Sequence, residues 1–316
     1  MADKHEAAQI RAADPAGIAA AAAVLRDGGL VALPTETVYG LAARADRAEA
    51  VAAIYRAKGR PDFNPLIVHV RSVAAAKALA EFDHRADALA AAFWPGALTL
   101  VLPLRADAGV ASAVTAGLPT IALRCPAHPV MRAVLDASAV PLAAPSANRS
   151  GGVSPTRAEH VAASLGSAVP LILDGGACAA GLESTIVALR DGGIWQILRP
   201  GPISEAQIAA VLGREADAVT SAAIEAPGQL ASHYAPGKPV RLNAASAADD
   251  EFLIGFGPVA GDLSLSPTGD LAQAAAGLYA ALHAGAASPK PRIAVATIPE
   301  EGIGAAINDR LRRAAA

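Results

Sequence analysis

Short apolar runs alternate with polar loops along most of the chain, and these runs predict the strands of an α/β fold. Buried strands are expected where aliphatic and β-branched residues run together between turn residues. Such runs occupy residues 29–33, 66–70, 98–104, 120–123, 140–144 and 171–173. Two further runs, 183–187 and 194–198, flank an Asp-Gly-Gly turn and predict a β-hairpin.

Helix boundaries are predicted from capping residues and glycines. Asp14-Pro15 and Gly28-Gly29 enclose a helix over 15–27, because aspartate caps a first turn and glycine ends a last one. Capping pairs are expected at three other helix starts: Asp46 with Glu49, Thr156 with Glu159, and Ser204 with Gln207. The remaining helices of this part are predicted within 72–93 and over 128–137.

The character of the chain changes after residue 212. Residues 213–239 contain Pro-Gly pairs without sustained periodicity and predict an interdomain linker. Beyond it, the runs 251–255, 270–284, 292–297 and 303–315 alternate between strand and helix patterns. We therefore expect an α/β domain over 1–212, a linker over 213–239, and a small α/β domain over 240–316.

Composition limits the classes of protein. Hydrophobic residues reach 53% of the 316 residues, but aromatic residues only 3%, and the longest apolar run, 17–25, is too short to cross a bilayer. The charged N-terminus does not match a secretory signal, so a cytoplasmic protein is expected. Cys125 and Cys178 lack metal-ligand spacing and favour buried thiols. The net charge of −3 does not predict charge-driven binding of nucleic acid.

Polar loops follow or precede several predicted strands. The loop at 34–41 carries hydroxyls and a carboxylate where a buried strand ends, which is where ligands bind in open α/β sheets. Lys58, Arg60 and Asn64 lie in a loop stiffened by glycine and proline that enters the next strand. This loop is either a cradle for phosphates or a solvated turn.

Two later strand ends carry further candidate groups. Arg124 ends a buried strand, where an unpaired charge is costly, so it either awaits a carboxylate in a cleft or forms an internal salt bridge. The loop at 145–152 is rich in hydroxyl, amide and glycine and leads towards a helix N-terminus, which favours anions.

Several familiar catalytic motifs are absent from the sequence. It has no P-loop, no dinucleotide-binding glycine motif, no HExxH and no GxSxG, and its seven histidines lack metal-ligand spacing. A cleft of hydroxyls, amides and cations without an activated nucleophile would act by positioning and charge stabilisation, as phosphoryl and nucleotidyl transfers do. Mg²⁺ carried on substrate phosphates would suffice, with no protein metal site.

Six motifs in order resemble the threonylcarbamoyl-AMP synthase family. They are PTETVYGL (34–41), KGRP with NPL (58–66), PSANRSG (145–151), ESTIV (183–187), RPG (199–201) and SHYAPG (232–237). The likeness covers nearly the whole chain and is to the two-domain form, a YrdC-like domain followed by a linker and a small C-terminal domain. It implies a twisted mixed α/β sheet with a large concave cavity.

The same resemblance implies an activity and a set of site residues. The family joins L-threonine, bicarbonate or CO2, and ATP into threonylcarbamoyl-AMP and pyrophosphate; other proteins then transfer the threonylcarbamoyl group to the tRNA adenosine beside the anticodon. Threonine would be held by Thr37, His69, Arg124, Ala144 and Ser184. ATP would be held by Lys58, Arg60, Asn64, Thr120, Ser146, Asn148, Ser154, Arg199 and Tyr234. Lys58 and Arg60 would be the catalytic pair, and the linker would close over the nucleotide.

Two other functions stay open at the level of sequence. A concave basic surface of this type could hold double-stranded RNA. The low net charge and the few aromatic residues argue against this function. The chain could also be a regulatory or carrier protein that binds a nucleotide without turning it over. A weak contact with tRNA, and no membrane partner, are expected under the synthase interpretation.

Overall fold

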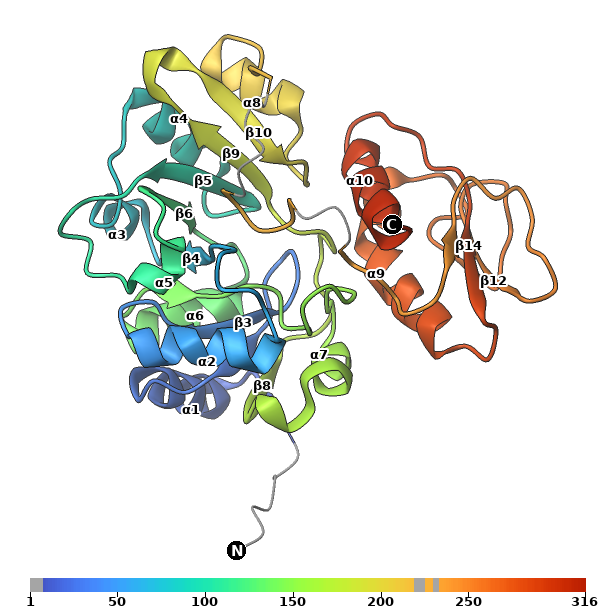
Figure 1. The fold of residues 1–316 in the computed structure, drawn as a ribbon, viewed down its shortest axis with the longest axis horizontal. Coiled ribbons are helices and arrows are strands. Elements are labelled where there is room, and N and C mark those ends of the chain that lie inside the picture. The colour runs from blue at the N-terminus through green and yellow to red at the C-terminus, as the bar shows by residue number, and fades with distance from the viewer. Residues whose placement is uncertain (1–7, 219–224, 230–232) are drawn as a thin grey trace, which may run out of the picture.

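The computed structural model describes residues 8–218, 225–229 and 233–316. It contains a ten-stranded mixed sheet and a four-stranded parallel sheet, in two domains that lie side by side (Figure 1). Both the mixed sheet of the first domain and the small α/β second domain were predicted from the sequence. Every helix among the described residues is too short or too polar to span a bilayer.

The large sheet has the strand order β1-β8-β2-β3-β7-β4-β6-β5-β9-β10. Its strands are β1 (Gln9–Ala12), β2 (Val31–Leu33), β3 (Gly40–Arg44), β4 (Ile67–His69), β5 (Leu98–Pro103), β6 (Thr120–Arg124), β7 (Leu142–Ala143), β8 (Leu171–Asp174), β9 (Thr185–Leu189) and β10 (Trp195–Arg199). The helices of this domain are α1 (Pro15–Arg26), α2 (Ala48–Lys58), α3 (Val73–Lys77), α4 (His84–Phe93), α5 (Ser112–Thr115), α6 (Pro129–Ser138), α7 (Ala158–Leu165) and α8 (Glu205–Leu212).

Hydrophobic clusters cover both faces of the large sheet. On one face, α1 and α6 bury side chains such as Leu25 and Val134 against β2 and β8. On the other, α2, α4, α7 and α8 bury side chains such as Ile54, Leu89 and Ile208. Apart from the edge strands β1 and β10, the strands are largely buried, which explains why their sequences are mostly apolar runs.

Three local predictions were wrong or incomplete. The carboxylate of Asp46 pairs with Arg44, with Nε–Oδ1 and Nη2–Oδ2 distances of 2.7 and 2.6 Å, so α2 begins after Arg47 with no side-chain cap. Helix α7 begins after Arg157, not at Thr156, also without a side-chain cap. Strands β1 and β3 were not predicted. The capping box of Ser204 with Gln207 is confirmed.

The second domain is built on the sheet β11-β14-β12-β13. Its elements are β11 (Val240–Arg241), β12 (Glu251–Gly255), β13 (Leu263–Ser264), α9 (Leu271–Ala287), β14 (Arg292–Val295) and α10 (Gly304–Ala314). Helices α9 and α10 lie on the side of this sheet that faces the first domain (Figure 1). The chain therefore ends on a helix at the domain interface.

The two domains share a continuous apolar core. Val38, Val153 and Leu182 of the first domain belong to the same buried cluster as the inner faces of α9 and α10. Gly181 adopts a φ of +68°, and a Cβ there would lie 2.5 Å from the Cα of Ala276. Because no other residue type fits so close an approach, the contact between α9 and the first domain is specific.

Two histidines stack across this interface. The rings of His160 on α7 and His283 on α9 lie 4.0 Å apart between centroids, and His283 Nε2 is 3.2 Å from the Ser154 carbonyl oxygen. Burial, together with the charge of His283, lowers the pKa of His160 to about 4, and burial lowers the pKa of His283. Both rings are therefore neutral at pH 7.

This pair predicts a loss of stability in mild acid. In the unfolded chain the histidines are protonated near pH 6.5, whereas in the folded protein His160 is protonated only near pH 4. The stability that this pair contributes above pH 6.5 is therefore lost as the pH falls from 6.5 towards 4. We expect the Tm of a His160→Phe/His283→Phe variant to fall less between pH 7 and 5 than that of the wild type. His84→Phe, an exposed position on α4, is the control. Parallel pH profiles for wild type and the double variant would contradict this expectation.

Candidate active site

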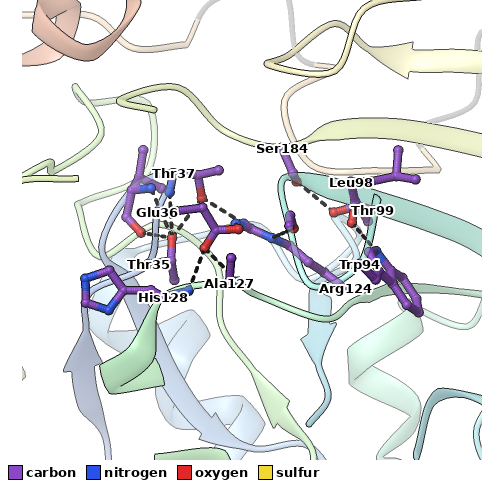
Figure 2. A network of polar contacts seen from close by, with 12 residues as sticks. Thr35, Glu36, Thr37, Trp94, Leu98, Thr99, Arg124, Ala127, His128 and Ser184 are labelled. Carbon is purple, nitrogen blue, oxygen red and sulfur yellow. Dashed lines mark hydrogen bonds and ion pairs between the residues drawn. The ribbon is translucent and has the colours of Figure 1, made fainter. Parts of the chain in front are cut away.

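The loop after β2 is held rigid by one threonine hydroxyl. Thr35 Oγ1 donates to the Val38 carbonyl oxygen at 2.7 Å and accepts the backbone N–H groups of Thr37 and Val38. It also lies 2.8 Å from Thr37 Oγ1 (Figure 2). These bonds fix the Thr37 hydroxyl at the edge of the pocket described below.

Arg124 forms the internal ion pair that was one of its two predicted roles. Its Nη2 lies 2.6 Å from Glu36 Oε1, its Nη1 donates to Thr37 Oγ1 at 2.7 Å, and its Nε donates to the Gly96 carbonyl oxygen at 3.1 Å (Figure 2). These bonds use three of the five guanidinium N–H groups. The ion pair therefore leaves Arg124 with donors for a further anion.

Glu36 is held ionised in this arrangement. Burial alone raises the pKa of Glu36, but the charge and hydrogen bond of Arg124 outweigh it, and the pKa lies below its ordinary value. Glu36 Oε2 also accepts the backbone N–H groups of Ala127 and His128 at 3.1 and 3.3 Å. Glu36 therefore orients the guanidinium and neutralises part of its charge.

His69 is the neighbour of Arg124 in the sheet, and their backbones pair directly across β4 and β6. Burial, with the charge of Arg124, lowers the pKa of His69 to about 3. Its Nδ1 is buried and has no hydrogen-bond partner among the described residues. A neutral ring with an unused nitrogen is suited to a hydrogen bond with a ligand.

Lys58 lies behind the loop at 145–148. Its ammonium donates to the carbonyl oxygens of Ser146 and Asn148, and the Ser150 N–H donates to the Lys58 carbonyl oxygen at 2.8 Å. Burial, with the charge of Arg60, lowers the pKa of Lys58. The ammonium has three N–H donors, so two bonds to carbonyls leave one for a ligand.

Arg60 reaches the pocket from the loop after α2. Gly59 ends that helix in the left-handed conformation, with a φ of 58°, and redirects the chain. Within the described part of the chain, Arg60 uses Nε and Nη2 to bind the carbonyl oxygens of Asn64 and Pro65. Burial lowers the pKa of Arg60 to about 10, so it remains a cation at neutral pH.

Two asparagine side chains near these cations have unused oxygens. Asn64 and Asn148 are buried, and neither Oδ1 has a partner among the described residues. The Asn148 amide nitrogen donates to the carbonyl oxygens of Arg149 and Gly152, both at 2.8 Å, which fixes the direction of Oδ1. Buried acceptors of this kind are usually satisfied by water or a ligand.

Another part of the pocket wall is built around Arg199 at the end of β10. Its Nε and Nη2 donate to the Ser184 carbonyl oxygen at 3.1 and 3.0 Å, and its Nη1 donates to the Pro227 carbonyl oxygen at 3.3 Å. The Ser184 hydroxyl is 2.7 Å from Thr99 Oγ1. Arg199 thus ties the segment containing Pro227 to the first domain.

The pocket brings together most of the predicted site residues. Those that line it are Thr37, Arg60, His69, Arg124, Ala144, Ser146, Ser184, Arg199 and Tyr234. Lys58, Asn64, Asn148 and Ser154 lie behind its lining. Thr120 pairs with Pro103 at the far end of β6 from Arg124 and is not brought to the pocket. Ser232 lies outside the described residues.

The sequence did not identify several residues of the pocket as site residues. These are Thr35, Val38, Gly40, Glu183 and Gly228. His233 also lines the pocket and belongs to the linker that was expected to close over the nucleotide. Thr35, Val38 and Gly40 lie within the PTETVYGL motif and Glu183 opens ESTIV, so the motifs contained the signal. His233 carries a buried Nδ1 without a partner among the described residues, and burial lowers its pKa to about 3.

Comparison with known proteins agrees with this geometry. The family model described as "Telomere recombination" matches residues 23–201, and that described as "Threonylcarbamoyl-AMP synthase, C-terminal domain" matches residues 203–316. The chain is 42% identical to a threonylcarbamoyl-AMP synthase of Bacillus subtilis, over 94% of this chain and 92% of that protein. It is 45% identical to the threonylcarbamoyl-AMP synthase of Pyrococcus abyssi, over 68% of this chain and 64% of that protein.

A solved structure extends the likeness to both domains. The crystal structure of the P. abyssi Sua5 protein complexed with L-threonine superposes with a TM-score of 0.85 at 37% identity, over 94% of each chain. The matches to both domains define the class of the protein as a two-domain nucleotidyltransferase. The chain belongs to the threonylcarbamoyl-AMP synthase family, whose product serves tRNA modification.

Proposed function

We propose that the pocket holds L-threonine and ATP in adjoining sub-sites, with threonine at the Arg124 side. The observation that carries this proposal is the arrangement of Arg124, with donors left after its pair with Glu36, beside a neutral His69 with an unused Nδ1. A guanidinium fork suits the threonine carboxylate, and His69 Nδ1 can accept from the amine. Thr37, the backbone of Ala144, and Ser184 complete this sub-site.

The ATP sub-site lies at the opposite side, between Arg60 and Arg199. Both guanidinium groups are suited to phosphate oxygens, and Lys58 adds one ammonium donor. The remaining residues assigned to ATP are Asn64, Thr120, Ser146, Asn148, Ser154 and Tyr234. Of these, Thr120 has the weakest support, because it does not line the pocket.

The reaction then proceeds in two steps. The deprotonated threonine amine bonds to the carbon of CO2 and releases a proton to solvent water, or bonds to the carbon of bicarbonate while a C–O bond of bicarbonate breaks and water leaves; both routes give N-carboxythreonine. An oxygen of the new carboxylate attacks the α-phosphorus of ATP, and the bond from that phosphorus to pyrophosphate breaks. Lys58 and Arg60 act catalytically by offsetting the charge that builds on the phosphates. Because burial lowers the pKa of His69 to about 3, its ring stays neutral. The ring can therefore accept a hydrogen bond from the threonine amine without taking up the proton of that amine.

Mg²⁺ would enter with the triphosphate. Within the described residues no group of three or more His, Cys, Asp or Glu could hold a metal ion. The unused oxygens of Asn64 and Asn148 suit the water molecules that Mg²⁺ retains. When bound, the ion supplies positive charge to the leaving pyrophosphate.

The proposed division of the chain is a catalytic domain of 1–212, a linker of 213–239 and a C-terminal domain of 240–316. The linker is proposed to close over the ATP sub-site. His233 and Tyr234 line the pocket, and the Ala235 N–H donates to the Gly151 carbonyl oxygen at 2.8 Å. The product would pass to separate proteins that transfer the threonylcarbamoyl group to tRNA in the cytoplasm. Any contact with tRNA itself would be weak at a net charge of −3.

Adjoining sub-sites predict that both substrates bind at once. We expect the affinity for α,β-methylene-ATP, measured by calorimetry with Mg²⁺, to change less than threefold when L-threonine is saturating. The methylene bridge blocks pyrophosphate release, so the measurement reports binding alone. Competition, in which threonine displaces the nucleotide in proportion to its concentration, would contradict the arrangement.

A further inference from the structure

A buried polar network connects the C-terminal helix to the pocket wall. Its centre is the carboxylate of Glu183, which immediately precedes Ser184 in the first domain. Glu183 Oε1 accepts from the Ser154 hydroxyl at 2.5 Å, and Oε2 accepts from Tyr279 on α9 at 2.8 Å and from Arg310 Nε on α10 at 2.9 Å. One carboxylate thus joins two loops of the first domain to both helices of the second.

The charges of this network are fixed by one another. Burial raises the pKa of Glu183, but the positive charge of Arg310 outweighs it and brings that pKa to about 2. Arg310 is fully buried, and its remaining nitrogens bind Asp309 Oδ2 at 2.6 Å and the Pro200 carbonyl oxygen at 2.9 Å. Since Glu183 stays ionised, the Ser154 hydroxyl donates its proton there and can only accept from a ligand.

Arg310 also contacts the linker residue that lines the pocket. Its Cζ lies 5.3 Å from the centroid of the Tyr234 ring. The ring of Tyr279 also stacks on Tyr234, with 5.6 Å between the two ring centroids. Tyr234 has a φ of 64°, a left-handed conformation unusual for a large side chain. Such a conformation persists only where surrounding contacts hold it.

The catalytic domain does not supply these contacts alone. Gly228 lies so close to Tyr234 that a Cβ there would be 3.0 Å from the Tyr234 hydroxyl and 2.9 Å from Arg199 Cδ. The ring is therefore confined between the Arg199 wall and the helices α9 and α10. Arg310 and Tyr279 each contact both the ring and Glu183, and of these two groups Arg310 is the one that carries a positive charge.

We propose that Arg310 is a positioning residue for the nucleotide: it holds Tyr234 and the Glu183–Ser154 pair in place, so that the C-terminal domain contributes to ATP binding and not to threonine binding. This inference rests on the proposed assignment of Tyr234 and Ser154 to ATP. It gives the second domain a defined part in the reaction without any contact between Arg310 and the reacting atoms.

The test compares Arg310→Met with Arg312→Met in the full-length protein. Arg312 lies on the same helix but is exposed and pairs with Glu300 at 2.8 Å, so it is a matched control. We expect Arg310→Met to weaken α,β-methylene-ATP binding at least tenfold, with L-threonine affinity within twofold of wild type. Arg312→Met should change neither. Unchanged nucleotide affinity in folded Arg310→Met would overturn the inference.

A second variant separates positioning from stability, because Arg310→Met leaves an uncompensated buried carboxylate. Glu183→Gln/Arg310→Met removes both charges together. We expect the Tm of this double variant to recover towards that of the wild type, while its affinity for the nucleotide stays at least tenfold weaker than that of the wild type. Recovery of nucleotide affinity together with Tm would show a purely structural role and overturn the inference. Turnover of the wild-type protein is measured in the same series. Absence of turnover in the wild type would contradict the proposed function, whereas the variants test only the role of Arg310.

Discussion

Arg60→Met is expected to lower kcat a hundredfold or more while leaving the affinity for L-threonine within twofold. Arg60 lines the pocket, and its Nε and Nη2 are already anchored on the backbone of Asn64 and Pro65, so its charge is held in place before ATP binds. Preorganised charge of this kind stabilises the phosphates more in the transition state than in the ground state. Loss of one such donor typically costs about 10²–10³ in kcat.

The control for this prediction is Arg56→Met. Arg56 lies in the last turn of α2, one turn before Arg60, and is exposed. Steady-state kinetics with each substrate varied, together with calorimetry for threonine, separates the two effects. A variant in which threonine affinity collapses while kcat at saturation stays normal would contradict the assignment of Arg60 to the phosphates.

Arg124→Met is expected to weaken L-threonine binding by about 10- to 100-fold, the range for a lost hydrogen bond to a charged group. ATP-analogue affinity should stay within threefold, because Arg124 is assigned to the threonine carboxylate and not to the phosphates. Arg132→Met on α6, at an exposed position, serves as the control. Equal losses of threonine and nucleotide affinity would contradict the division into two sub-sites.

The same variant tests the role of Glu36. Arg124 holds the pKa of Glu36 below its ordinary value, so its removal should raise that pKa and lower stability near neutral pH. Glu36→Gln/Arg124→Met removes the ion pair as a unit and should recover stability without recovering threonine affinity. Recovery of threonine affinity in this double variant would show that Arg124 serves the fold and not the ligand.

Most elements of the fold were predictable because they are long or strongly patterned. The helix over 15–27 and the hairpin of β9 and β10 carry clear local signals. Strand β3 was not predictable in this way, because residues 40–44 form a short segment that begins inside the motif at 34–41, which reads as a loop. Its strand conformation comes from antiparallel pairing with β2 and β7. Strand β7 is about 100 residues away in the sequence, so this pairing has no local signal.

Side-chain roles were less predictable than strand positions. The bidentate pair of Arg44 with Asp46 removed the expected cap of α2, and no local pattern distinguishes that pair from a capping box. Arg124 was recognised as unusual, but its pairing with Glu36 joins residues 88 positions apart and required the fold. Lys58 was expected to face the ATP phosphates, and the sequence did not indicate that its ammonium donates to carbonyl oxygens of the loop at 145–148.

The interface between the domains was the part of the site that the sequence predicted least. The sequence predicted a linker over 213–239 but gave no reason to connect Glu183 with Arg310, residues 127 positions apart. Glu183 lies in the ESTIV motif, which was used only to recognise the family, and Arg310 lies in none of the six motifs. The physical signal, a buried arginine that balances a buried carboxylate, exists only once α10 is packed on the first domain.

The most direct test of this account is pyrophosphate release from ATP and Mg²⁺ by the full-length protein, with L-threonine and bicarbonate omitted in turn. The account predicts that release requires both, because the nucleophile that attacks the α-phosphorus is made from them. Pyrophosphate release that is independent of threonine, or nucleotide binding with no release under any combination, would contradict it.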